Sequence, residues 1–134
     1  MKFERRNTVE DKEVYERMSF KTTDSEIRNP DGSIVFSAKN IEIPEGWSQV
    51  AADVLAQKYF RKAGVPKILK KVHEEGVPPF LQRSVEDKEA LKKIDPDQRY
   101  SSETTAIQVF DRLAGAWAYW GWKGNYFDSE QDAK

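Results

Sequence analysis

The side chains in this chain that could take part in chemistry are few and scattered. Two pairs of carboxylates, Glu86 with Asp87 and Asp95 with Asp97, are of the residue type that binds hard cations or performs acid–base catalysis. Neither pair stands in a recognisable metal-binding loop or at a defined catalytic spacing. Aspartate in such surroundings is typical of turns and helix caps, so we assign those roles to both pairs.

Histidine and cysteine, which carry much of enzyme chemistry, are almost absent. The chain has one histidine, His73, and no cysteine. Without cysteine it can form no disulfide, thiolate zinc site or thiol nucleophile, and a lone histidine cannot build a metal site. We expect His73 to face solvent or to cap a helix. We predict no catalytic, cofactor-binding or metal-binding residue in this chain.

A basic cluster lies in the middle of the sequence. Lys62, Lys67, Lys70 and Lys71 follow Arg61. Such a cluster can be a solvated surface, can contact a phosphate or nucleotide, or can bind an acidic partner, and the sequence leaves these alternatives open. The whole chain has 22 basic and 23 acidic residues and a net charge of −1. Because a nucleic-acid-binding domain usually has a basic excess, we expect no nucleic-acid partner.

The large apolar side chains are concentrated in residues 110–127. The chain is otherwise polar, with a mean hydropathy of −0.80 and 34% charged residues. The run can be ordinary core, a docking face for a partner, or a platform for stacked bases. A platform needs basic neighbours, and only Lys123 lies among the aromatic residues. The candidate docking residues are Trp117, Tyr119, Trp120, Trp122, Tyr126 and Phe127.

Residues 19–43 are predicted to form a β-hairpin. The segment Asn29–Gly32 is a strong turn signal, because its proline fixes φ at one corner and its glycine adopts positive φ at another. After the turn, Ile34, Phe36 and Ala38 recur at every second position, as in a half-buried strand. Since two strands alone are marginal in water, we expect the hairpin to pack on a helix.

Two stripes of helical spacing follow the hairpin. Ser48 is a good N-cap for a helix within residues 47–62, whose apolar positions fall four apart. A second helix is expected over residues 102–121, with Glu103 in its first turn and apolar residues at alternating spacings of three and four. These two helices are the clearest elements of the sequence.

The remaining segments carry weaker signals. Residues 1–18 are charged and weakly patterned, and we expect a flexible arm there. Residues 63–101 are predicted to be a loop-rich connection, with a short basic helix over Lys67–Glu75 and another that Ser84 caps. Residues 128–134 read as the start of a truncated helix with Ser129 as its N-cap. We therefore expect the chain to be part of a longer polypeptide or a separately encoded half.

Together these patterns predict a single domain or fragment, residues 1–134, of the α+β class and mostly helical. Its expected architecture is an N-terminal β-hairpin packed on two main amphipathic helices, with a loop-rich connection that carries short helices. No segment reaches the roughly 18 apolar residues that span a membrane, and no signal-peptide core follows the first charged residues. We therefore expect no membrane partner and a cytoplasmic location.

Several long segments resemble a known family. They are similar to the N-terminal region of class II ribonucleotide reductases, the vitamin B12-dependent enzymes, and they occur in the same order. The resemblance covers essentially the whole chain. The segments are Glu26–Phe36, Trp47–Arg61, Phe60–Pro66 and Glu103–Ala114, followed by Trp120-Gly-Trp122 and Tyr126-Phe127.

The resemblance implies a function for the whole enzyme and a limited role for this chain. Enzymes of the family reduce ribonucleotides to deoxyribonucleotides, with adenosylcobalamin generating a thiyl radical on a cysteine of a downstream ten-stranded α/β barrel. This chain has no cysteine, so no catalytic position is carried over and we expect the chain by itself to be inactive. The implied partner is the catalytic barrel, on the same or an adjacent polypeptide, and a homodimer is a further candidate.

Two hypotheses from different classes follow. In the first, the chain is the non-catalytic N-terminal part of a B12-dependent ribonucleotide reductase and braces the downstream barrel. In the second, it is a free-standing adaptor or regulatory module with a reductase-like fold, which binds a protein partner or a nucleotide without chemistry. A reading frame that continues into, or adjoins, a segment with the catalytic cysteines favours the first hypothesis.

Overall fold

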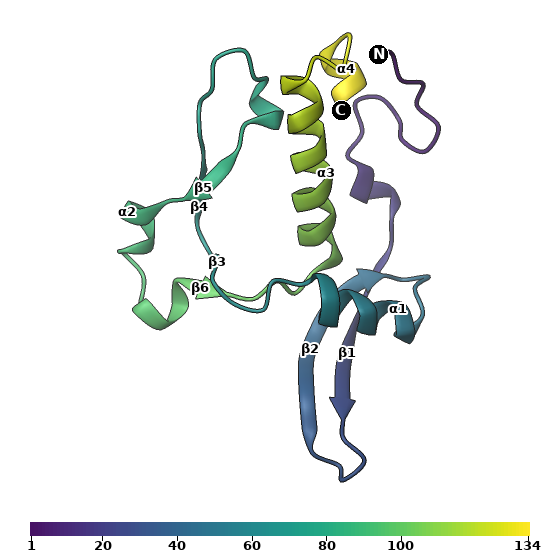
Figure 1. Cartoon of the computed structure of the whole chain (residues 1–134), viewed down its shortest axis with the longest axis vertical. Coiled ribbons are helices and arrows are strands. Elements are labelled where there is room, and N and C mark those ends of the chain that lie inside the picture. The colour runs from purple at the N-terminus through teal and green to yellow at the C-terminus, as the bar shows by residue number, and fades with distance from the viewer.

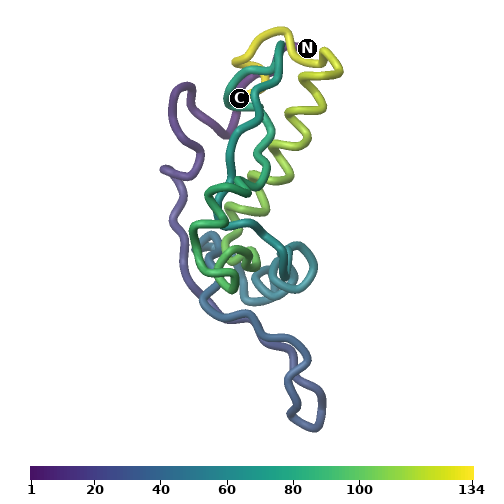
Figure 2. Tube along the Cα trace, turned by 90° about the vertical axis from the view of Figure 1, so that its left-hand side faces the viewer, coloured from purple at the N-terminus to yellow at the C-terminus, as the bar shows by residue number.

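The β-hairpin and one long helix set the shape of the molecule, which is elongated (Figures 1 and 2). The computed structural model describes all residues, Met1–Lys134. The hairpin consists of β1 (Phe20–Arg28) and β2 (Ile34–Pro44), and the helix is α3 (Ala106–Lys123). The hairpin projects from one end of the molecule, while α3 runs through the other half.

The two strands of the hairpin pair antiparallel, from Phe20 opposite Pro44 to Arg28 opposite Ile34. The connecting turn is closed by a hydrogen bond of 2.8 Å from the Asn29 N–H to the Ser33 carbonyl. The register shifts between Thr23 and Ser25. On the opposite strand, Asn40 adopts a φ of +54°, and its backbone N–H donates to Asp24 Oδ1 at 2.7 Å. The hairpin therefore has a built-in bulge.

The segment after the hairpin is less regular than the predicted helix over residues 47–62. The α-helix α1 covers only Gln49–Val54, and the chain continues as a π-helical turn, η2 (Leu55–Tyr59). The Ser48 hydroxyl caps α1 by accepting from the Ala51 N–H at 3.2 Å, as the sequence predicted.

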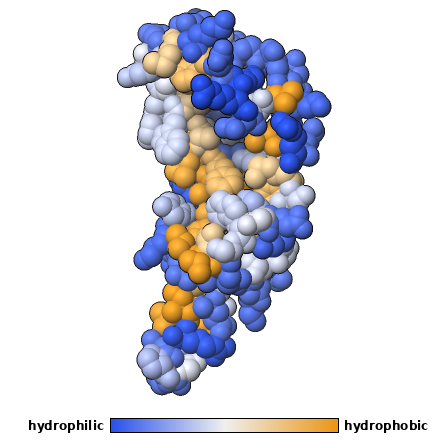
Figure 3. Space-filling model, turned by 90° about the vertical axis from the view of Figure 1, so that its right-hand side faces the viewer, coloured by the Kyte–Doolittle hydropathy of each residue, from blue (hydrophilic) through white to orange (hydrophobic).

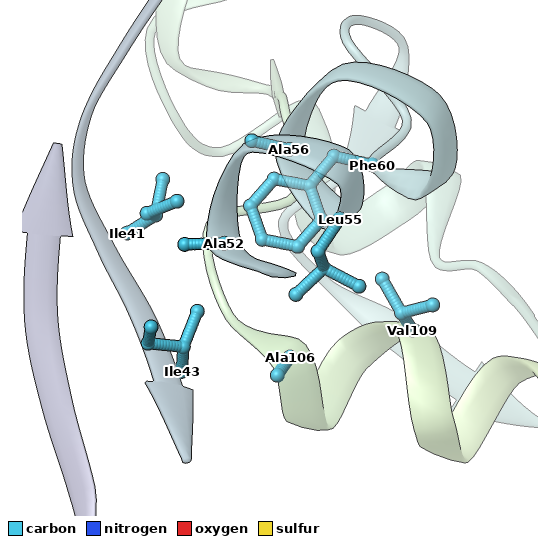
Figure 4. Packing of buried hydrophobic residues seen from close by; sticks show 8 residues of the cluster. All are labelled: Ile41, Ile43, Ala52, Leu55, Ala56, Phe60, Ala106 and Val109. Carbon is cyan, nitrogen blue, oxygen red and sulfur yellow. The ribbon is translucent and has the colours of Figure 1, made fainter. Parts of the chain in front are cut away.

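The core lies where β2, α1, η2 and α3 meet (Figure 4). It is small, because only 15 of the 134 residues are buried. In Figure 4 the side chains from β2 and from the start of α3 point toward those of α1 and η2. The cluster consists of Ile41, Ile43, Ala52, Leu55, Ala56, Phe60, Ala106 and Val109.

The connection between η2 and α3 contains two small antiparallel sheets, which sequence patterns did not reveal. Strand β3 (Val65–Pro66) pairs with β6 (Tyr100–Ser101), and β4 (Leu69–Lys71) pairs with β5 (Ser84–Glu86). The basic helix predicted over Lys67–Glu75 is therefore wrong, because β4 occupies that segment.

The short helices of this connection are single turns. They are η3 (Pro79–Leu81), α2 (Lys88–Leu91) and η4 (Pro96–Gln98). Ser84 was predicted to cap a helix but lies in β5. The cap of α2 is instead Asp87, whose Oδ1 accepts from the Ala90 N–H at 3.1 Å. The carboxylate Asp87 therefore has the capping role that we assigned to it.

Helix α3 begins later than the sequence predicted. The predicted helix began at residue 102, whereas α3 begins at Ala106 after its N-cap Thr105, which forms a capping box with Gln108. The Thr105 hydroxyl accepts from the Gln108 N–H at 3.2 Å, while Gln108 Oε1 accepts from the Thr105 N–H at 3.1 Å. Glu103 therefore lies before the helix and not in its first turn.

The predicted fold class needs correction. The structure contains 35% helix and 23% strand, with a few antiparallel sheets, so it is not mostly helical. Nor does it have two main amphipathic helices, because α1 has six residues and α3 has 18. The π-helical turn and the paired short strands, whose partners lie far apart in sequence, account for the difference.

The two ends of the chain lie together (Figure 1). The N-terminal arm, which contains the 3-10 turn η1 (Val14–Arg17), reaches the C-terminal turn α4 (Glu130–Ala133). The Phe3 N–H donates to Asp132 Oδ1 at 2.8 Å, and the Met1 amino group pairs with Asp128. Ser129 caps α4, as predicted. No helix is both long enough and apolar enough to cross a membrane.

Candidate docking surface

The six candidate docking residues divide into two groups. Tyr119, Trp122 and Phe127 are half-buried and make contacts within the chain. The other three side chains are largely exposed: Trp117 (63%), Trp120 (65%) and Tyr126 (61%). Only the second group presents most of its side-chain surface to solvent.

Two members of the first group, Tyr119 and Trp122, hold the loop before η3 against α3. Tyr119 Oη donates to Glu74 Oε2 at 2.8 Å, and Lys123 Nζ donates to Glu74 Oε1 at 2.7 Å. Trp122 Nε1 donates to the Gly76 carbonyl at 2.7 Å. The hydrogen bond from Lys123, and to a smaller extent that from Tyr119, lowers the pKa of the Glu74 carboxyl. The hydroxyl of Tyr119 and the indole N–H of Trp122 therefore give these two aromatic residues a role in holding the fold together.

Phe127 fixes the C-terminal segment to α3 and to the arm. Its ring lies 5.6 Å, centroid to centroid, from that of Phe3. The ring also sits so close to Gly121 that a Cβ on that glycine would lie 2.6 Å from Phe127 Cε2. A larger residue at Gly121 would therefore force the Phe127 ring to move.

Trp117 and Trp120 continue the apolar stripe of α3 beyond the core. Within the stripe, Phe110 and Leu113 pack against the core cluster, and Phe110 makes an edge-on contact with Trp47 at 5.8 Å between centroids. One turn later the same stripe faces solvent. The stripe, though not the whole helix, is thus covered in its first half and exposed at Trp117 and Trp120.

A second apolar surface adjoins this stripe on α1 and η2. It is a hollow of about 390 Å³, and its residues are Trp47, Ser48, Val50, Ala51, Val54, Leu55 and Tyr59. Figure 3 shows apolar side chains gathered along one face of the molecule, from the hairpin across its middle. The apolar residues of the hollow are the stripe of helical spacing that marked the predicted helix over residues 47–62, and only Leu55 among them is buried.

The carboxylate of Glu103 links the end of η2 to α3 through hydrogen bonds. Its side chain is 4% exposed and that of Arg112 is 26% exposed. Arg112 Nε donates to Glu103 Oε1 at 2.9 Å, and the Arg61 N–H donates to Glu103 Oε2, also at 2.9 Å. Burial opposes ionisation of Glu103, but these hydrogen bonds outweigh it and lower the pKa of the carboxyl.

The other residues considered for chemistry are not brought together. No group of three or more His, Cys, Asp or Glu side chains could hold a metal ion. His73 is exposed, with Nδ1 at 3.4 Å from Gln82 Nε2. In the basic cluster, Lys62 lies over the Phe36 ring at 4.8 Å, whereas Lys71 donates to the Gln82 carbonyl at 2.9 Å. These two lysines thus have separate local partners.

Comparison with known proteins decides the family. A family model described as class II vitamin B12-dependent ribonucleotide reductase matches residues 21–134. This chain belongs to the class II ribonucleotide reductases. The resemblance expected from the sequence is thereby confirmed, and the chain corresponds to the N-terminal part of such an enzyme.

Individual class II reductases align over nearly the whole chain. The vitamin B12-dependent ribonucleotide reductase of Bradyrhizobium diazoefficiens is 60% identical over 134 residues, which are 100% of this chain and 11% of the relative. That of Agrobacterium fabrum is 61% identical over 133 residues, 99% of this chain and 10% of the relative. That of Streptomyces coelicolor is 26% identical over 113 residues, 83% of this chain and 11% of the relative. The chain therefore spans only about a tenth of these class II reductases.

Proposed function

We propose that this chain is a non-catalytic N-terminal domain that packs against the remainder of a B12-dependent ribonucleotide reductase and braces its catalytic barrel. The observation that carries the proposal is the exposure of Trp117 and Trp120, at 63% and 65%, on a stripe whose first half is core. Since the relatives are about nine times longer than the aligned segment, a large body is available to cover that stripe.

The energetics favour such a contact. Each exposed tryptophan presents a large apolar surface, and aromatic side chains dominate the energies of interfaces. Only 15 of the 134 residues are buried, which is few for a chain of this length. Burial of the exposed half of α3 would therefore add stability that the chain does not supply by itself.

The reaction and cofactor of the family belong to this proposal as well. We expect ribonucleotide reduction with adenosylcobalamin in the intact enzyme, with the cofactor and the reacting cysteines on the downstream part. The cytoplasmic location stays a prediction.

A binding experiment tests the bracing role. The chain is tagged and mixed with the Bradyrhizobium reductase lacking the aligned segment, after circular dichroism has established that this remainder is folded. We expect a stable complex, and we expect Trp120→Ser to weaken it. Absence of a complex with a folded remainder would refute bracing and would favour a free-standing module.

A further inference from the structure

The outward side of α1 and η2 is apolar, and we call it the α1 face. It consists of Val50, Val54 and Tyr59, which are exposed by 71%, 47% and 53%. They line the hollow of about 390 Å³, in which Ser48 is the only residue that is not hydrophobic. The Ser48 hydroxyl already accepts the Ala51 N–H. The hollow therefore fits apolar side chains better than a phosphate or a nucleotide.

Two polar side chains of α1, Gln49 and Asp53, are hydrogen-bonded to the hairpin. Gln49 Nε2 donates to the Asp24 carbonyl at 2.8 Å, and Thr23 Oγ1 donates to Gln49 Oε1 at 3.0 Å. Ser25, which is 1% exposed, donates to Asp53 Oδ1 at 2.7 Å. The side chains of α1 that bond the hairpin thus leave Val50 and Val54 on the outward side, where an ordinary surface helix carries polar residues.

The third side of α1 and η2 contributes to the core. Ala52, Leu55 and Ala56 belong to the same buried cluster as Ile41 and Ile43 of β2 (Figure 4). The segment thus has apolar residues both toward the core and toward solvent. Apolar residues on a second side of a helix are expected where a further element covers that side.

We infer that the α1 face is covered in the intact reductase by an apolar segment of the same polypeptide, from the part outside this chain. The inference rests on the proposed function and adds a second contact to that of α3. The aligned segment is 11% of the Bradyrhizobium relative. A segment tethered to the chain has a high effective concentration at this surface, which favours it over a separate partner.

A footprinting experiment tests the inference in an intact enzyme. The chain replaces the aligned segment of the Bradyrhizobium reductase, and hydroxyl-radical labelling of Tyr59 is compared between this enzyme and the isolated chain. We expect Tyr59 to be labelled in the isolated chain and protected in the enzyme. Val50→Asp and Val54→Asp should restore labelling in the enzyme. Val35→Asp is the matched control, because Val35 is 60% exposed at the hairpin and outside the α1 face; it should leave Tyr59 protected.

Two outcomes would overturn the inference. Equal labelling of Tyr59 in the enzyme and in the isolated chain would mean that the α1 face stays open. Protection of Tyr59 in the isolated chain through self-association, measured by light scattering and abolished by Val54→Asp, would make a second copy the occupant. If Trp117 and Trp120 are protected in the enzyme while Tyr59 is not, the inference fails and the proposed function stands.

Discussion

Glu103 and Arg112 form an ion pair that ties the end of η2 to α3. Arg112 Nη2 donates to Glu103 Oε2 at 3.0 Å and to the Tyr59 carbonyl at 2.9 Å. The Glu103 N–H in turn donates to the Arg61 carbonyl at 2.8 Å. The pair therefore sets how the α1 face and the α3 stripe lie relative to each other.

Replacement of Arg112 by Ala should destabilise the chain strongly. It would leave the Glu103 carboxylate, 4% exposed, without its charged partner. Removal of one member of a buried pair costs about 3 kcal/mol or more. The measurement is the free energy of unfolding from urea titration. Arg83→Ala is the control, because Arg83 is 58% exposed at 3.8 Å from Glu74 and its loss should cost no more than about 1 kcal/mol. Equal costs for the two variants would contradict this account.

Acid should weaken the fold through the same carboxyl. The pKa of Glu103 is lowered from its ordinary value of 4.5, so the folded state favours the ionised form more than the unfolded state does. The stabilisation is therefore complete above pH 4.5 and is lost as the pH falls through the lowered pKa. Urea titrations at a series of pH values below 6 measure the loss. Glu103→Gln should make the free energy of unfolding less dependent on pH in this range. If the dependence is unchanged, carboxyls other than Glu103 cause the loss of stability in acid.

Two tryptophans of α3 should respond differently to substitution. Trp120 is 65% exposed, so Trp120→Phe should change the stability of the isolated chain by no more than about 0.5 kcal/mol. Trp122→Phe removes the hydrogen bond to the Gly76 carbonyl and should cost about 1 kcal/mol. Urea titration of both variants measures these differences. If Trp120→Phe costs more stability than Trp122→Phe, the division of the aromatic residues into a half-buried and an exposed group is wrong.

Asn40 should tolerate glycine but not valine. Its φ of +54° is in the left-handed region, where a β-branched side chain is strained by about 1–2 kcal/mol. Thermal unfolding of Asn40→Val should show a lowered midpoint, whereas Asn40→Gly should stay near the parent because the Asn40 N–H can still donate to Asp24. A stable Asn40→Val variant would indicate that the bulge can rearrange.

Local signals predicted some elements well. The turn at Asn29–Gly32 and the alternation after it place the hairpin, and the hydroxyl of Ser48 marks the start of α1. These features depend on neighbouring residues, so the sequence carries them directly. The start of α3 was misplaced, because the helix was predicted from residue 102, whereas the reciprocal hydrogen bonds between Thr105 and Gln108 begin it at Ala106.

Features that depend on distant residues were not predictable. Strands of two or three residues, such as β3 and β4, have no periodicity, and their pairing with β6 and β5 depends on the path of the chain. In the aromatic run, helical spacing alone could not show that Tyr119 is bonded within the chain while Trp120 is exposed. The difference is made by Glu74, which lies 45 residues away from Tyr119 in sequence.

The most direct test of the central claim is oxidative footprinting of Trp117 and Trp120 in the intact reductase that carries this chain. Trp122, which is bonded to Gly76 within the chain, serves as an internal reference. We predict that Trp117 and Trp120 are oxidised readily in the isolated chain and become as slow as Trp122 in the intact enzyme. If both remain as reactive in the enzyme as in the isolated chain, the exposed half of α3 does not dock on the reductase, and the proposed bracing role is wrong.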